Sequence, residues 1–178
     1  MFELVFTRRF SMAHRLLAGG SERCALPHGH NEYVRVSLRA TAPTALDGHA
    51  NMVLPFQRAK GIWHQFIDNH VDHALQLAQD DPLLGWFAQH EPQRAQRILV
   101  TPGDPTTELL ACLLMAKLNA FLAADGGILS CASIEIDETP TNTIRYSGDP
   151  LAVLPQPRPA AQCWWRRADM TIADTGLS

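Results

Sequence analysis

The sequence predicts an α+β domain in which two helices cover one face of an antiparallel sheet. Three observations support this fold class: two N-terminal segments alternate apolar and polar residues, two later segments have apolar residues at helical spacing, and a hairpin-like segment follows them. The resulting order is strand, strand, helix, helix, strand, strand, which is typical of α+β domains. A chain of 178 residues has the size of one such domain.

The two predicted N-terminal strands each bring histidines to an apolar face. In residues 2–15 the even positions carry Phe2, Leu4, Phe6, Phe10, Met12 and His14. In residues 30–40 one face carries His30, Val34, Val36 and Leu38, and His28 extends that face. Because alternate residues of a strand point to the same side, we expect the imidazoles of His14, His28 and His30 to converge inside the domain.

Two segments, residues 56–70 and 105–125, predict amphipathic helices. The second has recognisable ends, because Asp104 or Thr106 can cap its start and Gly126 follows its last apolar residues. The region between the two helices predicts only a short helix, loops and a small strand at 97–101.

Residues 131–146 predict a hairpin that completes the sheet. Ile134, Ile136 and Glu138 share one face of it, and an acid on an apolar face needs a partner or a ligand. We assign residues 1–148 to one domain. The proline-rich residues 149–178 form a C-terminal extension that packs on its own domain or on a neighbouring subunit.

Composition excludes several partners. A net charge of −3 and a pI near 6.2 provide no basic surface for nucleic-acid phosphates. The N-terminal residues MFELVFTRRF form neither a signal peptide nor a membrane span, so we expect a cytoplasmic protein without a membrane partner. The four cysteines have no CxxC spacing and predict reduced thiols rather than a disulfide framework.

The three histidines have the donor atoms of a catalytic zinc site. Three neutral imidazoles bind Zn²⁺ and leave the fourth position to water or substrate. Cys24, four residues before His28, has two interpretations: it completes a closed four-ligand site, or it stays off the metal as a base or nucleophile. Asp72 and His73 could relay a proton to or from that thiol, which favours the second interpretation. The alternative for this pair is a solvated surface position.

Glu138 is a candidate ligand-binding carboxylate. Its two oxygens match two parallel hydrogen bonds from the adjacent ring N–H and amino group of a guanine-like heterocycle. The alternative is a buried acid paired with an arginine. Glu108, near the start of the second helix, is also explained by its attraction to the helix dipole.

Five motifs in chain order, FSMAHR, CALPHGH, VDHAL, PTTELLA and IEIDETPTNTIRY, resemble those of the 6-pyruvoyl-tetrahydropterin synthase and 6-carboxy-tetrahydropterin synthase family. The resemblance covers residues 3–148. It implies the tunnelling fold, a four-stranded antiparallel sheet with two helices on one face. In that fold the subunits close a barrel as a trimer and stack as a hexamer, with active sites at the subunit interfaces.

The resemblance also implies a role for each candidate residue. The implied zinc ligands are His14, His28 and His30. The implied catalytic residues are Cys24, Asp72 and His73. The implied pterin-binding residues are Glu138, Thr107 and Glu108. In this assignment Cys24 stays off the metal and transfers protons.

The implied reaction converts 7,8-dihydroneopterin triphosphate into 6-carboxy-tetrahydropterin and releases acetaldehyde and triphosphate, a step of queuosine biosynthesis. The PTTELLA motif favours this bacterial branch over triphosphate elimination to 6-pyruvoyl-tetrahydropterin. Two further hypotheses are a zinc-stabilised pterin-binding protein without catalysis, in which Cys24 binds the metal, and an aldolase-like cleavage that gives 6-hydroxymethyl-dihydropterin.

Overall fold

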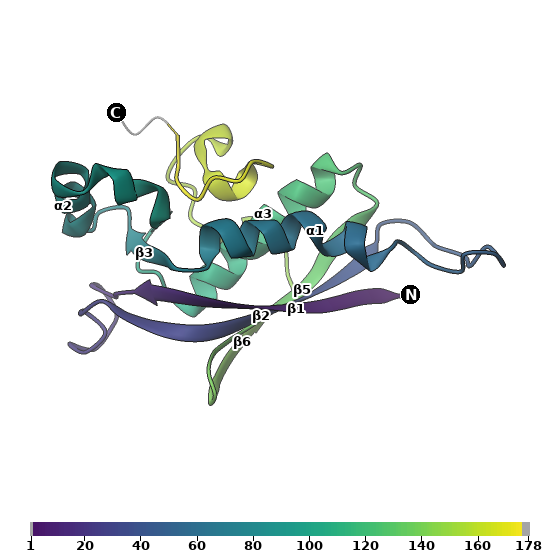
Figure 1. Ribbon diagram of the computed structural model, residues 1–178, viewed down its shortest axis with the longest axis horizontal. Helices are drawn as coiled ribbons and strands as arrows, with labels where there is room; N and C mark the ends of the chain where they lie inside the picture. The colour runs from purple at the N-terminus through teal and green to yellow at the C-terminus, as the bar shows by residue number, and fades with distance from the viewer. Residues whose placement is uncertain (1, 176–178) are drawn as a thin grey trace.

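The computed structural model describes residues 2–175, which fold around one β-sheet (Figure 1). Its strands are β1 (Glu3–His14), β2 (His28–Ala40), β3 (Ala74–Ala78), β4 (Ile98–Thr101), β5 (Leu129–Thr139) and β6 (Asn142–Tyr146). Its helices are α1 (Phe56–Phe66), α2 (Pro82–His90), α3 (Thr107–Ala124) and α4 (Pro150–Val153). Shorter helical turns are the π-helical Ile67–Val71 and the 3₁₀ turns Pro92–Arg97, Ala160–Gln162 and Trp164–Arg166. The predicted α+β class is confirmed.

Within residues 2–175 the sheet has six strands in the order β4-β3-β1-β2-β5-β6, so the prediction of four antiparallel strands is wrong. β1, β2, β5 and β6 form antiparallel pairs, whereas β3 runs parallel to the end of β1 and β4 runs parallel to β3. The small strand expected at 97–101 is β4, and β3 was not predicted. β3, with the sequence ALQLA, is a five-residue segment interrupted by a glutamine, which is too short for its periodicity to identify a strand.

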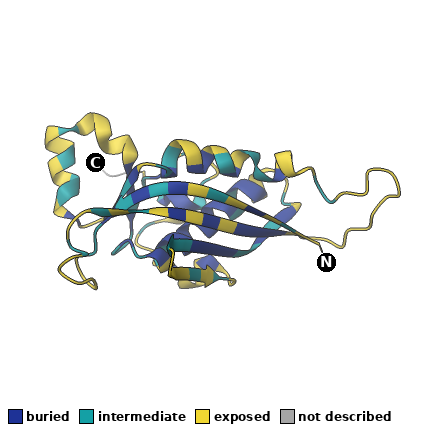
Figure 2. Ribbon diagram, turned by 60° about the horizontal axis from the view of Figure 1, so that its bottom comes forward, coloured by how far each residue is buried: buried dark blue, intermediate teal, exposed yellow. Residues whose placement is uncertain are grey.

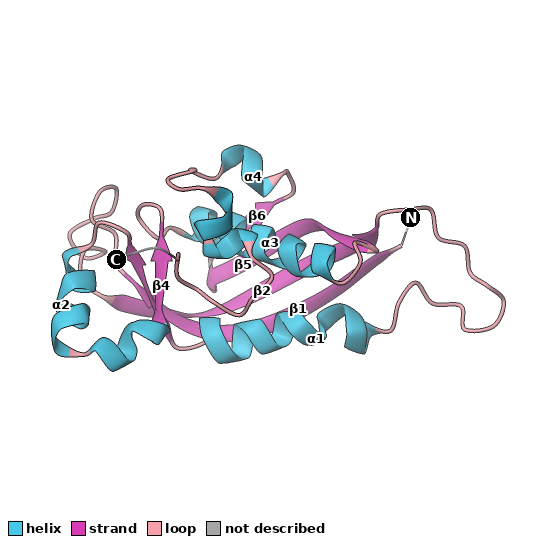
Figure 3. Cartoon of the chain, turned by 90° about the horizontal axis from the view of Figure 1, so that it is seen from above, coloured by secondary structure: helices cyan, strands magenta, loops and turns pink. Residues whose placement is uncertain are grey.

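Helices α1 and α3 lie on one face of the sheet (Figures 1 and 3), and in Figure 1 the opposite face carries no helix formed by the described residues. Every residue of α3 from 110 to 118 is buried, so this helix runs through the core. By length and hydropathy α3 could span a membrane, but 67% of it is buried inside the protein, as in the core helix of a globular domain. The sheet contributes Phe10, Val34 and Val36 to the same core.

Two segments project from this body (Figure 2). Helix α2 starts after Asp81, whose side chain accepts a hydrogen bond from the Leu83 N–H, and it has no buried residue. Its Trp86 is 45% exposed. Residues 41–52 form an exposed loop between β2 and α1 at the opposite end of the molecule.

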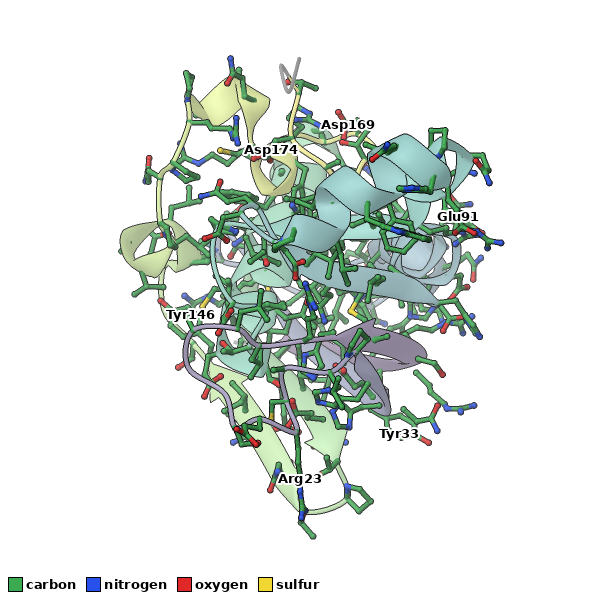
Figure 4. All side chains as sticks on the ribbon, turned by 90° about the vertical axis from the view of Figure 1, so that its left-hand side faces the viewer. Arg23, Tyr33, Glu91, Tyr146, Asp169 and Asp174 are labelled. Atoms are coloured by element: carbon green, nitrogen blue, oxygen red, sulfur yellow. The ribbon has the colours of Figure 1, made fainter. Side chains whose placement is uncertain are left out.

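The segment after β6 packs on the core of its own chain. Trp164 is fully buried, and its indole Nε1 donates a hydrogen bond to the Val100 carbonyl at 2.9 Å. The Val100 N–H donates to the Ile172 carbonyl at 3.3 Å, so this segment also covers the outer edge of β4. Figure 4 shows Asp169 and Asp174 of this segment in the upper part of the view. Residues 150–172 therefore complete the hydrophobic core.

Lys117 of α3 is buried beneath this segment. Its ammonium group donates hydrogen bonds to the Trp164 carbonyl at 3.0 Å and to Asp169 Oδ1 at 3.2 Å. The same group lies 5.3 Å from the centroid of the Phe66 ring. Burial lowers the pKa of Lys117 to about 8, although the charge of Asp169 opposes this shift.

We expect the burial of Lys117 to make the free energy of unfolding depend on pH in the alkaline range. Its pKa is about 8 in the folded chain and 10.5 when unperturbed, so the unfolded state binds more protons between these values. The free energy of unfolding should therefore rise with pH in this window. Urea titrations should show that the wild type gains stability relative to Lys117→Met as the pH rises from 8 towards 10.5. An equal change in both proteins would contradict the assignment.

Candidate metal centre and adjoining cleft

The three predicted imidazoles meet where β1 ends and β2 begins. The antiparallel register places His14 opposite His28 and Met12 opposite His30. One ring nitrogen of each histidine lies within 4.8 Å of those of the other two. The ring centroids of His14 and His28 are 4.6 Å apart. The predicted convergence is confirmed, and this donor set suits a metal ion with three nitrogen ligands.

Backbone carbonyls orient two of the three rings. His14 Nδ1 lies 2.9 Å from the Pro105 carbonyl, and His28 Nδ1 lies 2.8 Å from the Leu26 carbonyl. Because a carbonyl only accepts hydrogen bonds, Nδ1 carries the proton in both rings and Nε2 keeps its lone pair for a metal. Burial lowers the pKa of His14 against the effect of the Pro105 hydrogen bond, and His28 and His30 lower it further. The neutral imidazole is the form that binds a metal.

Gly29 allows β1 and β2 to approach closely between the two candidate ligand histidines of β2. A Cβ atom at this position would lie 2.9 Å from the Met12 carbonyl oxygen and 3.6 Å from Ala13. The neighbouring group at 2.9 Å is backbone, which cannot move without shifting β1. The glycine in the HGH motif is therefore a steric requirement of the strand pair that carries the histidines.

We expect Gly29→Ala to destabilise the fold by about 1–3 kcal/mol, the usual cost of overpacking a close contact. It should also weaken metal binding, because the shift of β2 moves His28 and His30. Gly61→Ala in α1 is the matched control, since its Cβ would meet no atom within 4 Å. That change should stabilise the fold by up to about 1 kcal/mol. Thermal unfolding and zinc titration measure both effects, and wild-type metal affinity in Gly29→Ala would contradict this argument.

Cys24 lies in the loop between β1 and β2, outside the group of metal-ligating atoms. Its Sγ is not among the atoms that lie within 4.8 Å of one another. It lies 3.2 Å from Ser21 Oγ instead. Cys24 is half-buried, whereas the other three cysteines of the described chain are buried, and all four are free thiols. This arrangement favours the interpretation in which the thiol stays off the metal.

Asp72 and His73 form a pair that is fixed to β1. The pair follows the π-helical turn, a local irregularity that is frequent at functional sites. Asp72 Oδ1 accepts a hydrogen bond from the Ser11 N–H at 2.7 Å, and Asp72 Oδ2 lies 2.8 Å from His73 Nδ1. His73 adopts a left-handed φ of 63°, and its N–H donates to the Ser11 carbonyl at 2.7 Å. The backbone thus holds this residue in a strained conformation.

The electrostatics of this pair suit proton transfer through the His73 ring. Burial raises the pKa of Asp72, but hydrogen bonds from the Ser11 N–H and from His73 lower it by more, so the carboxylate stays ionised. It accepts the proton of His73 Nδ1 and leaves Nε2 available. The His73 side chain is 77% exposed and lines a hollow with Ser11 and Asn31. Among the described residues no hydrogen bond joins His73 to Cys24.

The predicted binding residues share a cleft with one of the predicted metal ligands. Glu138, Thr107, Glu108 and His14 line a cavity of about 530 Å³ between the start of α3 and the β5–β6 hairpin. Glu138 Oε1 accepts a hydrogen bond from Thr107 Oγ1 at 2.5 Å. Glu108 lies in the first turn of α3 and is exposed. The cleft can therefore hold a polar ligand with one end at the histidines and the other at a carboxylate.

Glu32 is a buried acid next to the predicted binding residue Glu138 that the sequence reasoning missed. It lies on the buried face of β2 between His30 and Val34, and its Oε2 has no hydrogen-bond partner among the described residues. Because Tyr33 pairs with Asp137, the next pair in the register brings Glu32 beside Glu138. Burial raises the pKa of Glu32 to about 8, and the charge of Glu138 contributes to this shift. An acid at an even position of an apolar strand face was the signal in the sequence.

An α+β domain that gathers three histidines at the end of its sheet, beside a cleft with a carboxylate, belongs to the class of proteins that could hold a metal ion next to a small polar ligand. The family model for 6-pyruvoyl tetrahydropterin synthase matches residues 3–149. The chain belongs to this family. Residues after 149, which include the segment around Trp164, lie outside that match.

Relatives and solved structures agree with this assignment. The 6-carboxy-5,6,7,8-tetrahydropterin synthase of Rickettsia felis is 30% identical over 136 residues, which cover 75% of this chain and 93% of the relative. An uncharacterized protein of Wolinella succinogenes has a similar structure, with a TM-score of 0.65 and 22% identity over 82% of this chain and 97% of its own. The 6-pyruvoyl tetrahydropterin synthase of Caenorhabditis elegans gives a TM-score of 0.53 and 24% identity over 83% and 95%. The two structures support the fold.

Proposed function

We propose that the protein is a zinc-dependent enzyme that converts 7,8-dihydroneopterin triphosphate and water into 6-carboxy-5,6,7,8-tetrahydropterin, acetaldehyde and triphosphate. The observation that carries this proposal is the single cleft lined by both His14 and Glu138. It has room for a bicyclic ring at the carboxylate and a hydroxylated side chain at the histidines. The name of the Rickettsia felis relative favours the carboxy product.

The roles of the residues follow from their chemistry. Glu138 would accept two hydrogen bonds from the N–H and amino groups of the pterin, and Thr107 would hold the carboxylate in place through its hydroxyl group. Cys24 would transfer protons between the side chain and the ring of the substrate. Asp72 would keep His73 in the tautomer whose Nε2 accepts a proton from the thiol or returns it.

The three histidines would hold the zinc ion through one nitrogen each. When bound, zinc would polarise the hydroxyl oxygens of the substrate side chain and acidify the attached C–H groups. His73 is exposed on the outer side of the sheet, and we propose that subunits associate so that this ring approaches Cys24 of a neighbour. A homo-oligomer would then complete each active site.

Product analysis tests the reaction. Zinc-loaded protein is incubated with 7,8-dihydroneopterin triphosphate, the pterin is identified by mass spectrometry, and acetaldehyde is trapped in parallel. The proposal expects 6-carboxy-tetrahydropterin together with acetaldehyde. A 6-pyruvoyl product without acetaldehyde would instead identify triphosphate elimination, and zinc binding without turnover would identify a binding protein.

A further inference from the structure

Residues 101–108, with the sequence TPGDPTTE, join β4 to α3 and contact several parts of the site. The Pro105 carbonyl orients His14, and Thr107 holds Glu138, as described above. Asp104, between β4 and Pro105, belongs neither to the histidine cluster nor to the lining of the cleft. Its carboxylate instead reaches the loop of residues 15–27, which carries Cys24.

The Asp104 carboxylate accepts hydrogen bonds from three consecutive backbone N–H groups of that loop. Oδ1 accepts from Leu17 at 2.9 Å, and Oδ2 accepts from Ala18 at 2.8 Å and from Gly19 at 2.9 Å. Burial raises the pKa of Asp104, but these three hydrogen bonds lower it by more, so the Asp104 carboxylate is ionised at neutral pH. Hydrogen bonds to an ionised acceptor are about twice as strong as neutral ones.

Backbone hydrogen bonds within the loop connect the segment held by Asp104 to Cys24. The Leu16 N–H donates to the Cys24 carbonyl at 2.8 Å, and the Cys24 N–H donates to the Ser21 carbonyl at 2.8 Å. Gly20 lies so close to Leu16 and Cys24 that no side chain fits at its position. A Cβ atom there would lie 2.8 Å from both Leu16 Cβ and Cys24 Cβ. The loop is therefore closely packed on itself, and fixing residues 17–19 fixes the thiol.

A second ionic contact holds the start of the loop. Arg15 forms a two-pronged pair with Asp81, in which Nε donates to Oδ2 at 2.7 Å and the terminal nitrogen donates to Oδ1. The Asp81 side chain is 1% exposed. Arg15 follows directly after the ligand His14, so this pair holds the junction between the strand and the loop. The backbone N–H groups of residues 17–19 are held by Asp104 and not by the Arg15–Asp81 pair.

We propose that Asp104 is the positioning residue for Cys24: it holds the loop in the one conformation that brings the thiol to the substrate. This inference rests on the proposed function, in which the Cys24 thiol transfers protons and must therefore lie beside the substrate. Asp104 itself touches neither the substrate cleft nor the metal ligands. Its removal should therefore affect the thiol and the catalytic rate more than substrate binding.

The test compares Asp104→Ala with the wild type on zinc-loaded protein without substrate. Hydrogen exchange of the amides of residues 17–19 should become at least about tenfold faster, because their acceptor is lost. Iodoacetamide labelling reports on Cys24, the one cysteine of the described chain that is not buried, and its rate should change by at least about threefold. The kcat should fall by at least about tenfold with little change in KM. Asp104→Asn, which keeps one acceptor oxygen, should be intermediate.

Asp47→Ala is the matched control, because Asp47 also accepts backbone hydrogen bonds, from His49 at 2.8 Å and Asn51 at 2.9 Å, in the loop at the far end of the molecule. It should leave the labelling of Cys24 and the kcat unchanged. If Asp104→Ala fails to fold, Asp104→Asn carries the test, and it should change both the exchange of the amides of residues 17–19 and the labelling rate of Cys24 relative to the wild type.

Unchanged amide exchange and labelling in Asp104→Ala would overturn the proposal. So would a mobile loop with wild-type kcat, provided that Cys24→Ala is inactive. If the wild type itself shows no turnover, the proposed function fails, whereas faster exchange and altered labelling in Asp104→Ala still support the anchoring of Cys24. The two failures are therefore distinguishable.

Discussion

Cys24→Ala is expected to lower the turnover of 7,8-dihydroneopterin triphosphate by about 10²- to 10⁴-fold, the usual contribution of a positioned proton-transfer group. The same variant should bind as much zinc as the wild type, because the thiol lies outside the histidine cluster. Its side chain is half-buried in a loop, so the fold should be retained. Steady-state kinetics and metal analysis of one preparation measure both quantities.

His28→Ala is the comparison that distinguishes loss of a metal ligand from loss of a proton-transfer group. It removes a proposed ligand whose ring is held by the Leu26 carbonyl, so zinc and turnover should be lost together. Zinc-dependent activity at the wild-type level in Cys24→Ala would refute the catalytic role. Cobalt substitution gives an independent check, since a thiolate bound to the metal produces an intense charge-transfer band that we expect to be absent.

Trp164→Ala is expected to lower the free energy of unfolding by about 3–5 kcal/mol, the range for truncating a buried tryptophan. The side chain is fully buried, and its Nε1 hydrogen bond to Val100 would be lost as well. Because Trp164 belongs to the segment outside the family match, a large effect would show that this segment has become part of the core. Urea denaturation measures the change.

Trp86→Ala is the matched control for that measurement. Trp86 lies on α2, a helix without buried residues, and is 45% exposed. Its truncation should change the free energy of unfolding by less than about 0.5 kcal/mol. Equal effects of the two substitutions would contradict the burial argument.

The antiparallel part of the fold could be predicted because its signals are local. Alternation along β1 and β2 is visible within a dozen residues, and it assigned His14, His28 and His30 to one face. The same reasoning failed for β3, because a five-residue strand becomes stable only through its parallel pairing with β1, more than sixty residues earlier in the chain.

The candidate site likewise combines features with local sequence signals and features that depend on long-range contacts. The histidine cluster follows from strand periodicity, whereas the contact of Asp104 with residues 17–19 joins positions more than eighty residues apart. The left-handed backbone of His73 also has no signature in the sequence, since it depends on the π-helical turn before it and on the Ser11 carbonyl beside it. Periodicity predicted which histidines lie together, and tertiary contacts determine how their rings are held.

The docking of Trp164 on the core has a consequence for the order in which the chain folds during synthesis. Val100 and Trp164 are 64 residues apart, so at about 5–20 residues per second the partner of β4 emerges roughly 3–13 s later. During that interval Phe66, which lies beside the Lys117 ammonium, lacks the Trp164 indole that stacks on its ring. The nascent chain therefore carries all of its proposed zinc ligands before its core can close, and chaperones that bind exposed aromatic surface would act in that interval.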